Sequence, residues 1–94
     1  MIVLNVTYKC KTGMRDTFLE KINAEGIGEA CRAEDGCEKY DYYSPADGSG
    51  DLLLVEKWRD ADALTKHAAQ PHFKRLGELK GTFVNDTIIE RFEK

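Results

Sequence analysis

The 94-residue chain is long enough for one small domain, and a chain of this size buries only about 60–65% of its unfolded surface. A formal net charge of −3, with basic residues scattered among acidic ones, argues against nucleic acid or an anionic membrane as a partner. No apolar run approaches the roughly 18 residues of a membrane span, and the first residues resemble a strand rather than a signal peptide, so we expect a cytoplasmic protein.

The N-terminal third of the chain predicts a strand followed by a helix. Residues 2–9 are rich in β-branched and aromatic side chains, which is typical of a strand. Apolar residues then recur at helical spacing over residues 14–33. Gly26 and Gly28 lie inside this segment, and glycine within a helix costs about 1 kcal/mol relative to alanine. We therefore expect a bend or a close packing contact at these glycines.

Two strands and a loop follow. Residues 37–44 and 51–58 have strand composition, and the intervening PADGSG segment, residues 45–50, is typical of a loop. Asp60 then predicts the N-cap of a short helix.

The C-terminal third predicts a second helical segment and a last strand. Pro71 interrupts the helix capped by Asp60 and suits the first position of a new helical segment, which Gly81 is expected to end. Residues 82–92 have the composition of a strand. The order β-α-β-β-α-β over residues 1–94 predicts one α+β domain of the ferredoxin-like class, with an antiparallel sheet covered by helices on one face.

The predicted strands carry more apolar residues than a sheet covered on one side requires. Leu52, Leu53, Leu54 and Val55 are apolar toward both faces, whereas the helices can cover only one. A second copy of the chain is the simplest cover for the other face. We therefore expect a homodimer in which two sheets face each other.

Motifs for cofactors and metals are absent from the sequence. There is no glycine-rich phosphate loop, zinc-finger spacing or EF-hand loop, and the cysteines Cys10, Cys31 and Cys37 form neither an even set nor a CxxC pair. His67 and His72 are five residues apart, which on one regular helix points them about 140° apart. We therefore expect reduced thiols and no bound metal.

Four residues are candidates for a site. His67 shares a helix face with Leu64 and is either a core-edge histidine or a base in a pocket between helix and sheet. His72 is either a first-turn surface residue or a ligand contact. Trp58 suits a core or a pocket wall equally well, and Asn5 interrupts an apolar strand, where an amide is either satisfied structurally or used to hold a ligand.

A family resemblance rests on several of these residues. The segments VEKWRD (55–60), Ala63-Leu64 and HAAQPHF (67–73), together with Gly36-Cys37 and Tyr40, make the chain similar to the antibiotic biosynthesis monooxygenase family. The resemblance spans essentially the whole chain, and it implies a dimeric α+β barrel.

The resemblance also implies a function. It implies a cofactor-independent monooxygenase that uses O2 to oxidise a quinol or another polyphenolic or polyketide-like aromatic molecule. Its catalytic residues would be His67 and His72, with His67 as the base. Its substrate-binding residues would be Asn5, Trp58, Phe73 and Phe83.

Other branches of the family offer alternatives. Haem-degrading relatives keep an axial histidine where this chain has Gly77, which disfavours haem. An isomerase-like branch that processes phosphorylated autoinducer-2 shares a segment that His67, Pro71, His72, Phe73 and Lys74 fit nearly as well. A non-catalytic dimer that binds a small ligand is the third reading.

Overall fold

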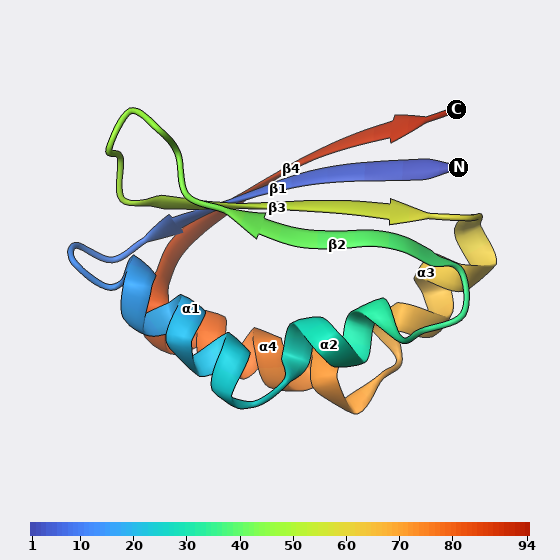
Figure 1. Cartoon of the computed structure of the whole chain (residues 1–94), viewed down its shortest axis with the longest axis horizontal. Helices are drawn as coiled ribbons and strands as arrows, with labels where there is room; N and C mark the ends of the chain where they lie inside the picture. Colours follow the sequence, from blue (N-terminus) through green and yellow to red (C-terminus); the bar gives the residue numbers. More distant parts are fainter.

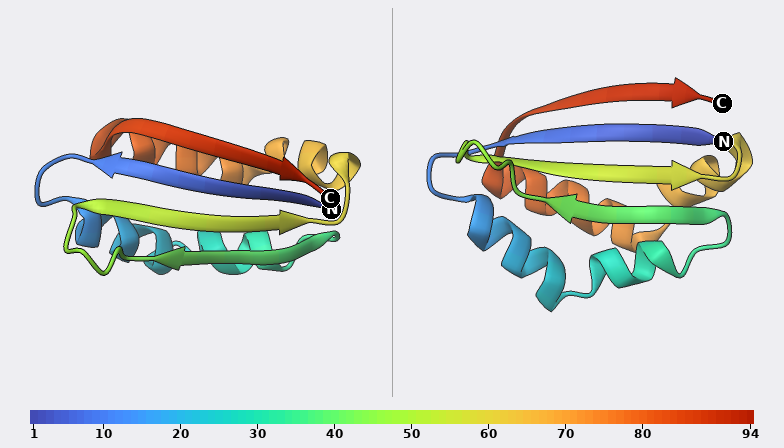
Figure 2. Two further views of the ribbon diagram at one scale, coloured as in Figure 1. Left: turned by 90° about the horizontal axis from the view of Figure 1, so that it is seen from above. Right: turned by 45° about the horizontal axis from the view of Figure 1, so that its top comes forward.

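The computed structural model describes all residues 1–94 as a four-stranded antiparallel sheet with helices on one face (Figure 1). The sheet order is β2-β3-β1-β4, which is the ferredoxin-like arrangement predicted from the order of elements. Two further views show that all the helices lie on the same side of the sheet (Figure 2). No helix is both long and apolar enough to cross a lipid bilayer. In chain order the elements are β1 (Ile2–Cys10), α1 (Arg15–Ala24), α2 (Ile27–Arg32), β2 (Cys37–Tyr43), β3 (Asp51–Trp58), α3 (Ala61–Ala68), α4 (Pro71–Phe83) and β4 (Val84–Glu93).

The expected bend at Gly26 is a full break between α1 and α2. Gly26 has φ +65°, a left-handed conformation that costs glycine nothing because it has no Cβ. The break allows α2 to turn and pack Ile27 and Cys31 against the sheet. The single helix expected over residues 14–33 is therefore two helices.

A second glycine brings the end of α2 close to α3. Gly36 has φ +87°, and a Cβ placed on it would lie 2.5 Å from Cβ of Ala63 in α3. The backbone carbonyl of Gly36 also accepts a 2.8 Å hydrogen bond from N–H of Arg59. Because no larger residue fits this contact, Gly36 fixes the loop that carries Glu34 against the helix that carries His67.

The helices on the C-terminal side begin as predicted. The Asp60 carboxylate accepts a 2.9 Å hydrogen bond from N–H of Ala63 and so caps α3. Pro71 occupies the start of α4.

The end of α4 differs from the prediction. The helix continues through Gly81 to Phe83, and β4 begins at Val84 rather than at residue 82. The reason is that Leu76, Leu79 and Phe83 form one buried stripe at helical spacing, and burial of Phe83 outweighs the cost of one glycine.

The two faces of the sheet are defined by the strand register. In β3 the even-numbered residues Leu52, Leu54, Glu56 and Trp58 are all buried under the helices. The odd-numbered residues face the opposite side, where Leu53 and Val55 remain partly exposed.

The face of the sheet away from the helices carries an apolar surface with no covering element. We call it the open face. Strand pairing places Val3 beside Phe92 and Thr7 beside both Ile88 and Leu53. Ile88 and Phe92 are 46% and 47% exposed. Both faces of the sheet therefore carry apolar side chains, as predicted from the sequence of β3.

Candidate functional site

A cavity of about 240 Å³ lies between the helix face of the sheet and helices α3 and α4. Most of its walls are apolar, and three of the side chains that line it can be charged: Glu56, His67 and Lys80. An apolar cavity with a few convergent polar groups is the usual form of a small-molecule site. The lining residues are Leu4, Val6, Tyr8, Glu56, Leu64, His67, Ala68, Phe73, Lys80, Thr87 and Ile89.

His67 lies in the last turn of α3 and is only 2% exposed. Its Nδ1 is 2.7 Å from Oε2 of Glu34. A carboxylate oxygen accepts hydrogen bonds, so this contact assigns the proton to Nδ1 and leaves Nε2 with a lone pair. Nε2 lies toward Glu56, 3.9 Å from Oε1. A neutral His67 is therefore held as the tautomer that can accept a proton at Nε2.

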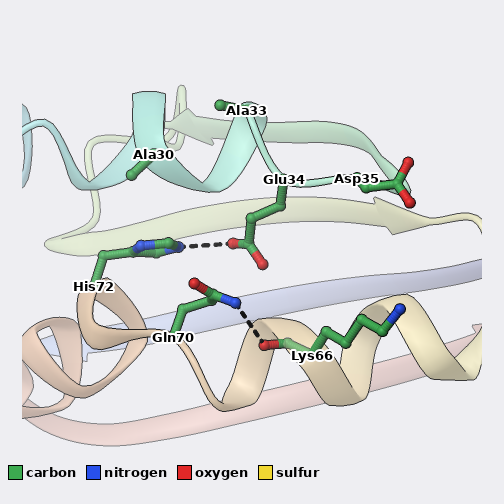
Figure 3. A pocket seen from close by; sticks show the side chains of 7 residues that line it. All are labelled: Ala30, Ala33, Glu34, Asp35, Lys66, Gln70 and His72. Atoms are coloured by element: carbon green, nitrogen blue, oxygen red, sulfur yellow. Dashed lines mark hydrogen bonds and ion pairs between the residues drawn. The ribbon is translucent and has the colours of Figure 1, made fainter.

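Glu34 connects His67 to His72. It follows α2 in the loop fixed by Gly36, and its side chain is 11% exposed. His72, in the first turn of α4, places Nε2 2.7 Å from the same Oε2 atom that contacts His67. Figure 3 shows this second contact at a pocket on the outer side of the helices, which Lys66 and Gln70 also line.

The two histidines thus meet, contrary to the divergence expected from their spacing. His67 ends α3 and His72 begins α4, so they do not belong to one regular helix. Gln70 has an extended backbone between them, and this break turns both rings toward Glu34.

Glu56 is the second carboxyl group at the cavity. It is 6% exposed, and Oε1 accepts a 2.9 Å hydrogen bond from Nε1–H of Trp58. Burial raises the pKa of Glu56, and this effect outweighs the opposing influence of the Trp58 hydrogen bond. The protonated form, which can donate a proton, is therefore favoured more than for an exposed glutamate.

Aromatic rings hold His67 in place. The ring of Trp58 lies 4.5 Å from the His67 ring with an interplanar angle of 33°, and Phe73 meets it edge-on at 5.2 Å. Tyr40 contacts a further side at 5.8 Å. Packing on several sides restricts the ring to one orientation, which a positioned proton acceptor requires.

The predicted site residues fall into three groups. His67 and Phe73 line the cavity. Trp58 packs against the His67 ring, and His72 is connected to His67 through Glu34, so these two residues support the cavity without lining it. Asn5 pairs with Val55 on the open face, so it does not line this cavity, because side chains alternate along a strand. Phe83 does not line it either, since it packs against Phe18 in the core.

Three residues of the site were not found from the sequence. Glu56 has a signal, because it alternates with Leu54 and Trp58 on the buried face of β3, where a carboxyl group is unusual. Lys80 follows Leu79 in α4, and its Nζ lies over the Tyr8 ring, 5.5 Å from the ring centroid. Glu34 has no local signal, since it is one acid in a polar loop.

A thiol completes this group of side chains. Sγ of Cys31, a carboxylate oxygen of Glu34 and one ring nitrogen from each of His67 and His72 all lie within 4.8 Å of one another. Nδ1 of His67 and Nε2 of His72 are the nitrogens that contact Glu34. Burial raises the pKa of Cys31 to about 12, so the thiol is protonated near neutral pH. The donor set of one sulfur, two imidazole nitrogens and a carboxylate suits a divalent transition metal rather than magnesium or calcium.

Comparisons with known proteins place this fold among solved relatives. The model of the family "Antibiotic biosynthesis monooxygenase" matches residues 1–79. The chain is 48% identical over 62 residues to "Putative monooxygenase Rv0793" of Mycobacterium tuberculosis, an alignment that spans 62% of this chain and 60% of that protein. It is 32% identical to "Putative monooxygenase YcnE" of Bacillus subtilis over 79% of this chain and 76% of that protein.

Solved structures share the whole fold. The structure of Rv0793 superposes with a TM-score of 0.87 at 26% identity, covering 99% of this chain and 93% of that one. The crystal structure of PA3566 from Pseudomonas aeruginosa superposes with a TM-score of 0.87 at 25% identity, covering 99% and 92%. The chain therefore belongs to the antibiotic biosynthesis monooxygenase family.

Proposed function

We propose that this protein is a cofactor-independent monooxygenase that oxidises a quinol or related phenolic aromatic molecule with O2. The observation that carries the proposal is the Glu34–His67 contact at 2.7 Å, which leaves Nε2 of His67 free to accept a proton beside an apolar cavity. The names of the two curated relatives support the reaction class.

The reaction begins with proton removal. His67 accepts a phenolic proton at Nε2, and Glu34 stabilises the resulting imidazolium through Nδ1–H. The electron-rich phenolate transfers one electron to O2, giving a substrate radical and superoxide. The two radicals combine at a ring carbon that bears a hydrogen, and the resulting peroxide anion takes the proton held by His67 to give a hydroperoxide. The hydroperoxide then loses its outer OH group and the hydrogen of that carbon as water, which leaves a carbonyl group on the ring. One oxygen atom enters the product and the other leaves as water.

Two other ionisable groups at the cavity fit this reaction scheme. The ammonium group of Lys80 is a positive charge that can stabilise the phenolate and superoxide. Protonated Glu56 can give its proton to the departing oxygen and recover one from His67, whose Nε2 is 3.9 Å away. The apolar walls exclude water from the radical pair.

His72 acts as a positioning residue in this scheme. It does not line the cavity, but it contacts the Glu34 oxygen that also contacts His67. Two hydrogen bonds to one oxygen fix the carboxylate and so fix the tautomer of His67.

We also propose that the protein is a homodimer joined through the open face. Val3, Leu53, Val55, Ile88 and Phe92 form an apolar surface there, with Asn5 in the middle of it. A second copy covers this surface symmetrically, which would complete the α+β barrel and bury the Asn5 amide at the interface.

Isotope labelling tests the reaction. A panel of quinols is incubated with the protein under ¹⁸O2 in buffer treated with a chelator, and product masses are measured. The proposal expects O2 uptake equal to product formed and one ¹⁸O atom in each product. A parallel run uses unlabelled O2 in H2¹⁸O. Product labelled only in that run, or no O2 uptake with any quinol, argues against the proposal.

A second candidate function is proton transfer without O2. Glu56 and His67 provide an acid and a base that face one cavity, which is the arrangement an isomerase requires. A product of unchanged mass, formed equally well without O2, would favour this reading.

A further inference from the structure

We propose that Cys31, Glu34, His67 and His72 form an inhibitory binding site for a divalent transition metal such as Zn²⁺. The site lies behind the catalytic cavity rather than in it, and neither the family match nor the relatives' names indicate it. Metal binding itself does not depend on the proposed function. Its inhibitory effect rests on that function.

Three separate segments of the fold bring the four residues together. Cys31 is at the end of α2, and Glu34 follows in a turn in which N–H of Glu34 donates to the carbonyl of Cys31 at 3.1 Å. This turn places both side chains on the same side of the chain. His67 and His72 come from the two helices that meet at the Gln70 break.

The distances between the ligand atoms are close to those of a metal site. In a tetrahedral zinc site, with bonds of about 2.0–2.3 Å, neighbouring ligand atoms lie about 3.3–3.8 Å apart. The four atoms here lie within 4.8 Å of one another, and each histidine nitrogen is 2.7 Å from Oε2 of Glu34. Because 2.7 Å is shorter than this spacing, the Glu34 carboxylate must turn away from the two histidines when the ion binds between them.

The charges of the four ligands also match a divalent cation. A thiolate and a carboxylate carry two negative charges, and two neutral imidazoles add none, so a divalent ion gives a neutral complex. Neutrality matters because Cys31 is 0% exposed and His67 only 2%. The metal displaces the thiol proton, and each imidazole keeps its one proton, which moves from the nitrogen that contacts Glu34 to the other ring nitrogen.

An ion can enter from the outer side of the helices. Glu34 and His72 border the pocket shown in Figure 3, and the His72 side chain is 18% exposed. Cys31 and His67 lie deeper. The site therefore has an entrance separate from the catalytic cavity, which His72 does not line.

Metal binding removes the base. An imidazole that binds a metal through Nδ1 keeps its one proton on Nε2, so Nε2 becomes a donor and accepts no proton. His67 would then donate toward Glu56 instead of taking a proton from the substrate. A quinol monooxygenase with metal at this site is inactive, and a chelator restores it.

Cobalt spectroscopy tests the site directly. The protein is stripped with a chelator and titrated with Co²⁺, whose thiolate charge-transfer band and visible bands report sulfur ligation and coordination geometry. We expect one Co²⁺ per chain, a charge-transfer band, visible bands of a tetrahedral site, and displacement by Zn²⁺. Cys31→Ser should remove the charge-transfer band, and His72→Ala should weaken Co²⁺ binding roughly 100-fold or more, since even indirect partners of a metal contribute about 10–100-fold.

Cys37→Ser is the matched control, because Cys37 is a partly buried cysteine outside the ligand group. It should retain both bands. Circular dichroism confirms that each variant is folded, and because His72 is less buried than Cys31, the His72→Ala result decides the case if Cys31→Ser does not fold. Absence of a thiolate band in the parent, or its loss in Cys37→Ser alone, overturns the site.

Activity separates this inference from the proposed function. If quinols cause no O2 uptake but Co²⁺ gives the expected bands, the metal site stands and the monooxygenase proposal fails. If O2 uptake is present and equimolar Zn²⁺ neither binds nor inhibits, only the metal site fails.

Discussion

His67 and His72 contact the same carboxylate oxygen of Glu34, each at 2.7 Å. Because that oxygen can only accept, both histidines present an N–H to it. The two rings therefore have fixed and opposite tautomers, with the proton on Nδ1 of His67 and on Nε2 of His72. This arrangement gives Glu34 its central position in the site.

Glu34→Gln tests whether the negative charge of Glu34 supports His67 as a base. The amide keeps the size of the side chain but removes the negative charge that stabilises a protonated His67. We expect kcat for quinol oxidation to fall roughly 10²–10⁴-fold. Glu38→Gln, an exposed neighbour, is the control and should keep the parent rate. Equal rates for both variants in an O2-electrode assay would show that Glu34 does not support the base.

His67→Ala should affect both activity and stability. Loss of the base is expected to lower turnover about 10²–10⁴-fold. His67 is 2% exposed rather than at the edge of the core, and removal of its side chain leaves a cavity and takes away one of the two histidine contacts of Glu34. Unfolding should therefore become easier by about 2–4 kcal/mol. Urea denaturation measures the second effect. Parent-like turnover combined with reduced stability would assign His67 a structural role only.

Lys80→Met tests the positive charge at the cavity. Methionine keeps most of the aliphatic stem but cannot stabilise a phenolate or superoxide. We expect kcat/KM to fall roughly 10–100-fold, below the full effect of a buried donor because Lys80 is partly exposed. Lys74→Met, at an exposed position of the same helix, is the control and should change kcat/KM less than about threefold.

Trp58→Phe tests the hydrogen bond that Trp58 donates to Glu56. The aromatic stack on His67 remains, but the 2.9 Å hydrogen bond to Oε1 of Glu56 is lost. A buried carboxyl group without that partner should lower the free energy of unfolding by about 1–3 kcal/mol, measured by urea denaturation. A variant as stable as the parent would mean that Glu56 finds another partner.

The sequence predicted the fold better than the site. Strand composition, the Asp60 cap and Pro71 are local signals, and each marks an element that the structure contains. The predicted end of α4 at Gly81 was wrong because Phe83 makes a tertiary contact with Phe18 that no local sequence signal indicates.

The site depends on contacts between segments distant in the sequence. Glu34 and His67 are 33 residues apart, so no spacing rule relates them. Asn5 and Trp58 were both expected to bind substrate, but the alternation along β1 puts the Asn5 amide on the open face. His67 and His72 lie on either side of the helix break that Pro71 predicts, so the angle of about 140° expected on one regular helix does not apply to them.

Leu53→Asp tests the dimer. The leucine lies on the open face, so in the proposed dimer the new carboxylate would be buried without a partner, at a cost of several kcal/mol. Sedimentation at low micromolar concentration should give twice the chain mass for the parent and the single chain mass for the variant. Thr65→Asp, on the exposed side of α3, should remain dimeric. A monomeric parent would contradict the proposed dimer.

The most direct measurement of the proposed base is the protonation of the two His67 nitrogens in the resting protein. Nitrogen-15 NMR of histidine-labelled protein, assigned with His67→Ala and His72→Ala, distinguishes the two tautomers. If Glu34 holds His67 as the structure indicates, Nδ1 carries the proton and Nε2 has the shift of an unprotonated nitrogen. A proton on Nε2 with Nδ1 unprotonated would contradict the proposal, because His67 would then have no lone pair directed toward Glu56 and the cavity.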